Sequence, residues 1–167
     1  MLTSLFLAAL LFSSQQADVP KESGVIVGKV IAPDESTLKQ PVQVVLMSPQ
    51  YATLFNQKLQ EQLDLYWERY KPAFAQKKEL FLEVSRMAYQ DSMQFVMGRM
   101  SRDLGPNLKN YRIESSADGK FQFRDIPFGS YNIVSYGRVG DQVYYWQEPV
   151  DITNSVPQFL QLKKHVP

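Results

Sequence analysis

The residue types that most often carry catalysis are scarce in this sequence. It has one histidine, His165, and no cysteine, so a histidine-based triad, a histidine metal site and a thiolate site all lack their components. The best-placed carboxylates for acid–base chemistry are Asp118 and Asp125. Asp118 precedes a glycine, which is typical of a turn, and Asp125 is interpreted as a loop residue. We interpret His165 as a tail residue, and we expect no enzyme, no cofactor and no metal site.

Aromatic residues near the end of the sequence offer binding chemistry instead. Tyr136, Tyr144, Tyr145 and Trp146 lie close together, and exposed aromatic faces on a sheet can stack on sugar rings. In a strand, Tyr144 and Trp146 point to one side and Tyr145 to the other. One of these sides is expected in the core, and the other is either open or covered by another element. An open side carrying Tyr136, Tyr144 and Trp146 predicts a carbohydrate site.

Length and charge limit the classes of partner. The chain has 167 residues, of which 44% are hydrophobic, and its formal net charge is +1. This is enough chain for one domain with its own core. A nearly balanced charge argues against a nucleic-acid partner. Apart from the N-terminus, no segment approaches the roughly 18 apolar residues of a membrane span, so none is predicted.

The N-terminus is predicted to be a targeting signal. Residues 5–12 form an apolar run that has the length of a signal-peptide core and is too short to cross a bilayer. Small and polar residues follow it, and cleavage after Ala17 would make 1–17 a signal peptide. We therefore expect export to the periplasm or the cell exterior, without a lipoprotein anchor because cysteine is absent. The alternative is that this run forms a buried N-terminal strand or helix.

Two parts of the sequence have the two-residue period of β-strands. In the stretch 24–46, hydrophobic residues alternate in two short runs. In the stretch 110–164, Phe121 and Phe123 alternate with polar residues after the turn dipeptide Asp118-Gly119. Further alternating pairs follow up to residue 162. About seven strands are expected in total.

The middle of the sequence, 49–106, is predicted to be helical. Ser48-Pro49 suits a helix start, and Gly105 with Pro106 suits a helix end. Pro72 is expected to end a first helix and to bend the chain. A hairpin follows from this pattern, because a chain that leaves a sheet must return to nearly the same place. Apolar residues recur at helical spacing in both predicted helices: Phe55, Leu59, Leu63, Tyr66 and Tyr70, then Phe74, Phe81, Ala88 and Phe95.

Read without this insertion, the strand-forming parts resemble the carboxypeptidase regulatory-like domain family. The match is carried by the run from Gly24 to Val30 and by the run from Asp118 to Ile133, which fits the pattern D-G-x-F-x-F-x-x-[IL]-P-x-G-x-Y-x-[IV] without a gap. The resemblance implies an exported, non-catalytic, antiparallel Greek-key β-sandwich of prealbumin type. On this reading 18–48 and 107–164 form the sandwich, and 49–106 is a two-helix hairpin that the family usually lacks.

The hairpin is therefore the expected contact element. Methionine side chains adapt to varied partners, and Met87, Met93, Met97 and Met100 fall in its second helix. Lys71, Lys77 and Lys78 make its predicted tip basic. Packing within the hairpin and an ordinary solvated bend remain the alternative explanations for these two sets. The function expected from the sequence is protein–protein interaction or self-association through the hairpin, with carbohydrate binding by the sandwich as the alternative.

Overall fold

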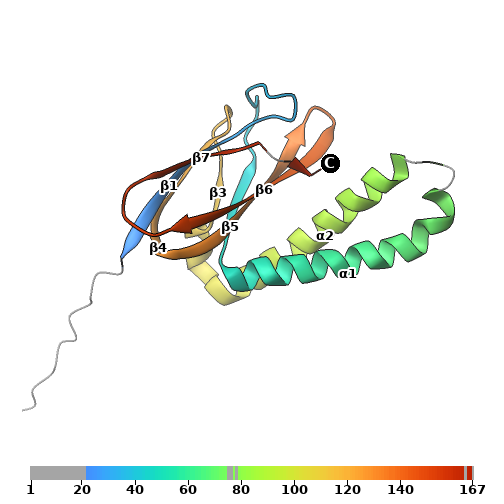
Figure 1. Ribbon diagram of the computed structural model, residues 1–167, viewed down its shortest axis with the longest axis horizontal. Helices are drawn as coiled ribbons and strands as arrows, with labels where there is room; N and C mark the ends of the chain where they lie inside the picture. Colours follow the sequence, from blue (N-terminus) through green and yellow to red (C-terminus); the bar gives the residue numbers. More distant parts are fainter. Residues whose placement is uncertain (1–21, 75–76, 78, 164, 167) are drawn as a thin grey trace, which may run out of the picture.

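The computed structural model describes residues 22–74, 77, 79–163 and 165–166 (Figure 1). Within these residues, two β-sheets pack face to face, and a hairpin of two helices covers the outer face of one sheet. The signal peptide predicted for 1–17 lies outside the described residues. The strands are β1 (Ser23–Val30), β2 (Gln43–Met47), β3 (Arg112–Glu114), β4 (Lys120–Pro127), β5 (Gly129–Val139), β6 (Gln142–Ile152), β7 (Gln158–Leu162) and β8 (His165–Val166).

The strands are divided unequally between the sheets. The small sheet has the order β4-β1-β7, and the large sheet has the order β3-β2-β5-β6-β8. All pairs in the large sheet are antiparallel. The fully antiparallel sandwich expected from the sequence is wrong in one pair, because β1 runs parallel to β7. The fold is a β-sandwich with a helical insertion.

The core between the sheets is built from the alternating residues of the strands. In β1 every second residue is buried, and Phe121 and Phe123 of β4 are buried as their spacing predicts. Trp146 of β6 lies fully inside, and its indole Nε1–H donates to the carbonyl oxygen of Ile31 at 2.9 Å. This bond joins the large sheet to the segment that follows β1, so the largest core side chain also fixes the alignment of the two layers.

The turn at Asp118-Gly119 depends on glycine for two reasons. Gly119 has a φ of +84°, and a Cβ at this position would lie 2.4 Å from the carbonyl oxygen of Val30. The Val30 amide in turn donates to the Gly119 carbonyl at 2.9 Å. Lys120 and Asp118 form an ion pair of 2.7 Å across the turn. Only a residue without a side chain fits both the backbone angle and the close approach to β1.

The insertion consists of α1 (Pro49–Phe74) and α2 (Glu79–Leu104), followed by the 3₁₀-helix η1 (Gly105–Asn110). Gly105 has a φ of +52°, the left-handed conformation expected at a helix C-cap. Pro72 lies inside α1 and does not end it, so Phe74 belongs to the first helix and not to the second. Since α1 ends two residues after Pro72, the hydrogen bond that proline cannot donate and the clash of its ring with the preceding turn disturb only the end of the helix.

The near half of the hairpin shares a second core with the large sheet. In β2, Val44 and Leu46 face the sandwich, while Val45 and Met47 face the helices, so all four are buried. We call this second core the proximal cluster: Val45, Met47, Tyr51, Phe55, Met93, Val96, Met100 and Val134. The hairpin is thus packed on the sandwich at its base.

The far half of the hairpin packs mainly on itself. Tyr66 of α1 and Val84 and Ala88 of α2 form a small buried cluster between the two helices. In Figure 1 the helices run past the end of the sheet at this level. We call this part, Leu59 to Phe74 with Glu79 to Ala88, the distal hairpin. Neither helix combines the length and the hydropathy that a bilayer crossing requires.

Candidate functional site

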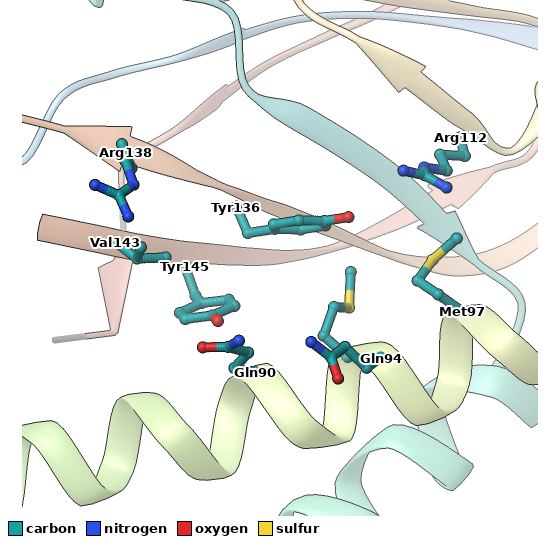
Figure 2. A pocket seen from close by; sticks show the side chains of 9 residues that line it. Gln90, Gln94, Met97, Arg112, Tyr136, Arg138, Val143 and Tyr145 are labelled. Carbon is teal, nitrogen blue, oxygen red and sulfur yellow. The ribbon is translucent and has the colours of Figure 1, made fainter.

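A cleft of about 520 Å³ opens between α2 and the outer face of the large sheet (Figure 2). Its volume is within the range of pockets that hold small organic ligands. We call it the sheet–helix cleft. The side chains that line it are Gln90, Met93, Gln94, Met97, Arg112, Tyr136, Arg138, Val143 and Tyr145.

The alternation of strand residues explains which side chains reach this cleft. On β5, Tyr136 and Arg138 are two residues apart and point away from the sandwich core. On β6, Val143 and Tyr145 do the same, paired with Arg138 and Tyr136 in the β5–β6 register. On α2, the four residues that line the cleft follow the pattern i, i+3, i+4, i+7, which places them along one face of the helix.

Tyrosine rings form the floor of the cleft. The rings of Tyr136 and Tyr145 stack with their centroids 6.2 Å apart and their planes 25° apart, and the Tyr89 ring also packs on Tyr145, at 5.3 Å between centroids. Burial raises the pKa of Tyr145 to about 12, with smaller contributions from Tyr136 and from the Asp91 carboxylate. The Tyr145 ring is therefore uncharged at every physiological pH.

Positive charge lies at both ends of the cleft. Figure 2 shows Arg138 and Arg112 on opposite sides of Tyr136. No acidic residue is among the side chains that line the cleft. Arg112 Nε donates to the amide oxygen of Gln43 at 3.1 Å. The nearest acids in the sequence are Glu114, two residues along β3, Asp141 in the β5–β6 turn, three residues after Arg138, and Asp91 on α2, which accepts a hydrogen bond from the Tyr66 hydroxyl.

The structure separates the aromatic residues proposed for sugar binding. Tyr136 is half-buried in the cleft, whereas Trp146 is 0% exposed and Tyr144 packs against the sandwich core. The prediction of a carbohydrate platform on Tyr144 and Trp146 is therefore wrong for Trp146, which no sugar ring can reach. The reason is that β6 turns its larger aromatic residue toward the interior, while the hairpin covers the Tyr145 side.

The four methionines predicted to contact a partner also fall into buried and accessible groups. Met93 and Met100 are buried in the proximal cluster, so the prediction that they contact a partner is wrong, and packing explains them. Met97 is half-buried at the edge of the cleft, and Met87 is 41% exposed. Only these last two can meet a partner without unfolding of the base of the hairpin.

The lysines predicted to make the hairpin tip basic lie only partly within the described residues. Lys71 and Lys77 are exposed near the end of the hairpin, and Lys78 lies outside the described residues. Acidic side chains also occur here, because Glu68 and Glu79 are exposed close to them in the sequence. The exposed lysines thus belong to a surface of mixed charge.

An aromatic cluster on the distal hairpin was not predicted as a surface feature. Trp67 and Phe74 stack at 5.1 Å with their planes 25° apart, and Phe81 meets Phe74 edge-on at 6.1 Å. These rings border a cavity of about 230 Å³, and Trp67 is 44% and Phe81 51% exposed. We call Trp67, Phe74 and Phe81 the tip cluster. The seven-residue repeat of Phe74, Phe81, Ala88 and Phe95 was the only sequence signal for it.

Asp118 and Asp125, the two candidate carboxylates, do not have the surroundings that a general acid or base requires. Asp118 accepts hydrogen bonds from Lys120 and from the Ser116 hydroxyl, which lower its pKa to about 2. A general acid needs a shift in the opposite direction. Asp125 is exposed where the β1–β4 register shifts, with a φ of +55°. Among the described residues, no group of three or more histidine, aspartate or glutamate side chains has the spacing to hold a metal ion.

Comparisons with known proteins assign no family. No family model and no curated protein matches the chain. Among solved structures, a proposed carbohydrate-binding protein of Pseudomonas aeruginosa is 15% identical, with 87% of this chain and 91% of that chain covered and a TM-score of 0.37. The pilus backbone protein RrgB of Streptococcus pneumoniae is 10% identical, with 82% and 40% covered and a TM-score of 0.32. TM-scores this low transfer neither a ligand nor an assembly.

Proposed function

We propose that the protein is an exported, non-catalytic β-sandwich module of the carboxypeptidase regulatory-like type that binds another protein through its distal hairpin. The observation that carries this proposal is the tip cluster with its neighbours. Large apolar side chains that are 38–51% exposed gather on the distal hairpin, beyond the helix base that packs on the sheet: Leu65, Trp67, Phe81, Leu82 and Met87.

The exposure of several large apolar side chains on the distal hairpin requires a physical explanation. The sandwich does not bury these side chains, because the proximal cluster that joins the hairpin to the large sheet is formed by residues at the base of the hairpin. Contiguous apolar surface on a soluble domain marks contact sites for partners. Trp67 belongs to the tip cluster, and tryptophan is among the residues most enriched in binding hot spots. The cavity beside Trp67, Phe74 and Phe81 is a concave feature into which a partner side chain can insert.

Export is part of the same proposal. It rests on the apolar run 5–12 and on the absence of cysteine, which suits a chain that folds without disulfides. Cleavage after Ala17 would leave a short segment before β1, which begins at Ser23. N-terminal sequencing of the protein from the native host tests this, and an intact Met1 on the folded protein would contradict it.

The docking proposal is tested by substitutions that keep the sandwich intact. Deletion of the whole hairpin is a poor test, because it would expose Val45, Met47 and Val134. The double variant Trp67→Ser/Phe81→Ser instead changes only half-exposed side chains. The matched control is Phe159→Ser, which removes a 79% exposed phenylalanine from β7 of the small sheet.

Affinity capture from envelope and secreted fractions compares the mature chain with these two variants. We expect a protein that the mature chain and the control retain and the double variant loses. Analytical ultracentrifugation of the same samples separates self-association from binding to a different protein. Equal capture by all three chains, with no difference in mass, would exclude the tip cluster as the contact surface.

A further inference from the structure

We infer that the sheet–helix cleft is a second binding site, and that its ligand is an acidic oligosaccharide with carboxylates on successive sugar rings. This inference does not depend on the docking role of the distal hairpin. It rests on four features of the cleft: its charge, the separation of its arginines, its aromatic floor and the amides on its helical wall.

The charge of the cleft selects an anion. Two of its lining residues are arginines and none is acidic. No carboxylate of the described residues forms an ion pair with either guanidinium, since the ion pairs there are Lys58–Glu61, Arg99–Asp103 and Lys120–Asp118. A guanidinium presents a planar fork of donors that matches a carboxylate in a bidentate manner.

The separation of the arginines selects an elongated ligand. Arg112 pairs with Val45, Val45 pairs with Val134, and Arg138 lies four residues further along β5. From these registers, the two arginine Cα atoms are about 17 Å apart. Figure 2 shows the two guanidinium groups on opposite sides of Tyr136, and Arg112 Nε is held by the Gln43 amide oxygen, so the two groups do not converge on one phosphate or one carboxylate. They suit a chain that carries a negative charge at each end of the segment it places in the cleft.

The middle of the cleft is suited to sugar rings. Between the arginines lies Tyr136, stacked on the neutral Tyr145. The negative face of an aromatic ring attracts the weakly positive C–H groups of a pyranose. On the opposite wall, Gln90 and Gln94 are exposed, one helical turn apart. Each amide can both donate to and accept from a hydroxyl group.

An acidic peptide fits less well than an acidic sugar. An extended peptide gains its affinity by adding to a sheet edge, but the cleft lies over the face of β5 and β6, whose edges are already paired with β2 and β8. A helical peptide needs an apolar groove, and this cleft contains two arginines and two glutamines. Peptide binding is therefore a competing outcome that the experiment must separate.

The test is calorimetric titration of the mature chain with tetragalacturonic acid, with its fully methyl-esterified form and with hexaglutamate. We expect binding of the acid, with little or none of the ester or the peptide. Arg138→Gln and Arg112→Gln should each weaken binding about tenfold or more, as loss of a charged hydrogen-bond donor does. Arg124→Gln is the matched control, because it removes an exposed arginine from β4 of the other sheet and should change nothing.

One further variant tests the floor of the cleft. Tyr136→Leu keeps an apolar side chain but removes the aromatic face, and it should weaken the binding of tetragalacturonic acid several-fold. Tryptophan emission and circular dichroism establish that each variant is folded, and the hairpin variant Trp67→Ser/Phe81→Ser should bind the acid as the mature chain does. The inference would be overturned if the acid did not bind, or if the ester bound equally well. It would also be overturned if hexaglutamate bound more tightly than the acid, or if both arginine variants kept the affinity of the mature chain.

Discussion

Truncation of Phe55 to alanine should destabilise the hairpin and the sandwich together. The Phe55 side chain is 0% exposed in the proximal cluster, and its ring packs 5.9 Å from that of Tyr89. Loss of a fully buried phenylalanine costs about 3–5 kcal/mol, from lost burial and the cavity left behind. With a urea m-value of about 2 kcal/mol per M for a domain of this size, the unfolding midpoint should fall by about 2 M.

The sequence supplies two reporters for this experiment. Its two tryptophans lie in different parts of the fold: Trp67 in the distal hairpin and Trp146 in the sandwich core. In a Trp67→Phe background the emission follows the sandwich, and in a Trp146→Phe background it follows the hairpin. Because the proximal cluster is shared by both parts, Phe55→Ala should shift both transitions by the same amount.

The control for this experiment is Leu65→Ala, also on α1 but 48% exposed. It should cost less than about 1 kcal/mol, because the side chain is already half in water. The reasoning is refuted if Phe55→Ala moves the Trp67 transition alone and leaves the Trp146 transition in place. In that case the hairpin would be a separate folding unit that rests on the sheet without stabilising it.

Three further predictions concern single positions. Gly119→Ala should lower the thermal midpoint more than Gly105→Ala does, because both have positive φ but only Gly119 also lacks space, with Val30 O 2.4 Å from a Cβ. Ser115→Ala should cost about 1–3 kcal/mol in urea unfolding, since the buried Ser115 hydroxyl accepts from the Val42 amide at 3.0 Å; an unchanged midpoint would contradict this. The folded-state pKa of Tyr145, about 12, is above its ordinary value of 10. The protonated Tyr145 hydroxyl therefore contributes at most about 3 kcal/mol to the free energy of unfolding, and this contribution is complete below pH 10 and lost as the pH rises through 12. The difference in urea stability between the parent chain and Tyr145→Phe should narrow or invert over that range. A constant difference would contradict the raised pKa of Tyr145.

Some features of the fold follow from local chemistry and were predictable. The Asp118-Gly119 turn and the alternation of Phe121 and Phe123 need only backbone angles and a two-residue period. The end of α2 at Gly105 likewise follows from one residue with positive φ. None of these depends on which other segment packs nearby.

The orientation of β6 could not be predicted from its sequence. Large aromatic residues occur on both sides of the strand, so alternation alone does not say which side is inside. The outcome depends on the hairpin, which covers Tyr145 and leaves Trp146 to the core between the sheets. The roles of Met93 and Met100 depend on the same packing, because helical spacing does not say whether a residue faces a sheet or a partner.

The arginines of the cleft were missed for a related reason. Arg112 and Arg138 are far apart in the sequence, and they meet one cleft only through the register that joins β3, β2 and β5. Strand register is set by long-range pairing that a single sequence does not specify. The available signal was the position of Arg138, two residues after Tyr136 and therefore on the same side of its strand.

The point of insertion explains how the hairpin can carry binding surfaces without disturbing the sandwich. The chain leaves the large sheet after Met47 and returns before Arg112, and β2 and β3 are direct neighbours. The Leu46 amide donates to the Tyr111 carbonyl at 2.8 Å, so the two ends of the insertion are joined by a backbone hydrogen bond.

It follows that the sandwich constrains mainly the base of the hairpin. The proximal cluster must keep its shape, because it covers one face of the large sheet. The distal hairpin packs mainly on itself, since Tyr66, Val84 and Ala88 form a buried cluster between its own helices. Arg86, which the shortened chain below retains, donates to the Gln142 side chain of β6 at 3.0 Å. Removal of residues 63–85, with a short glycine-rich turn in their place, should therefore preserve the urea midpoint reported by Trp146 and the binding in the cleft, while it abolishes docking through the tip cluster. A large loss of sandwich stability in this shortened chain would show that the distal turns support the fold, and their exposed aromatic residues would then lose their best explanation as a contact surface.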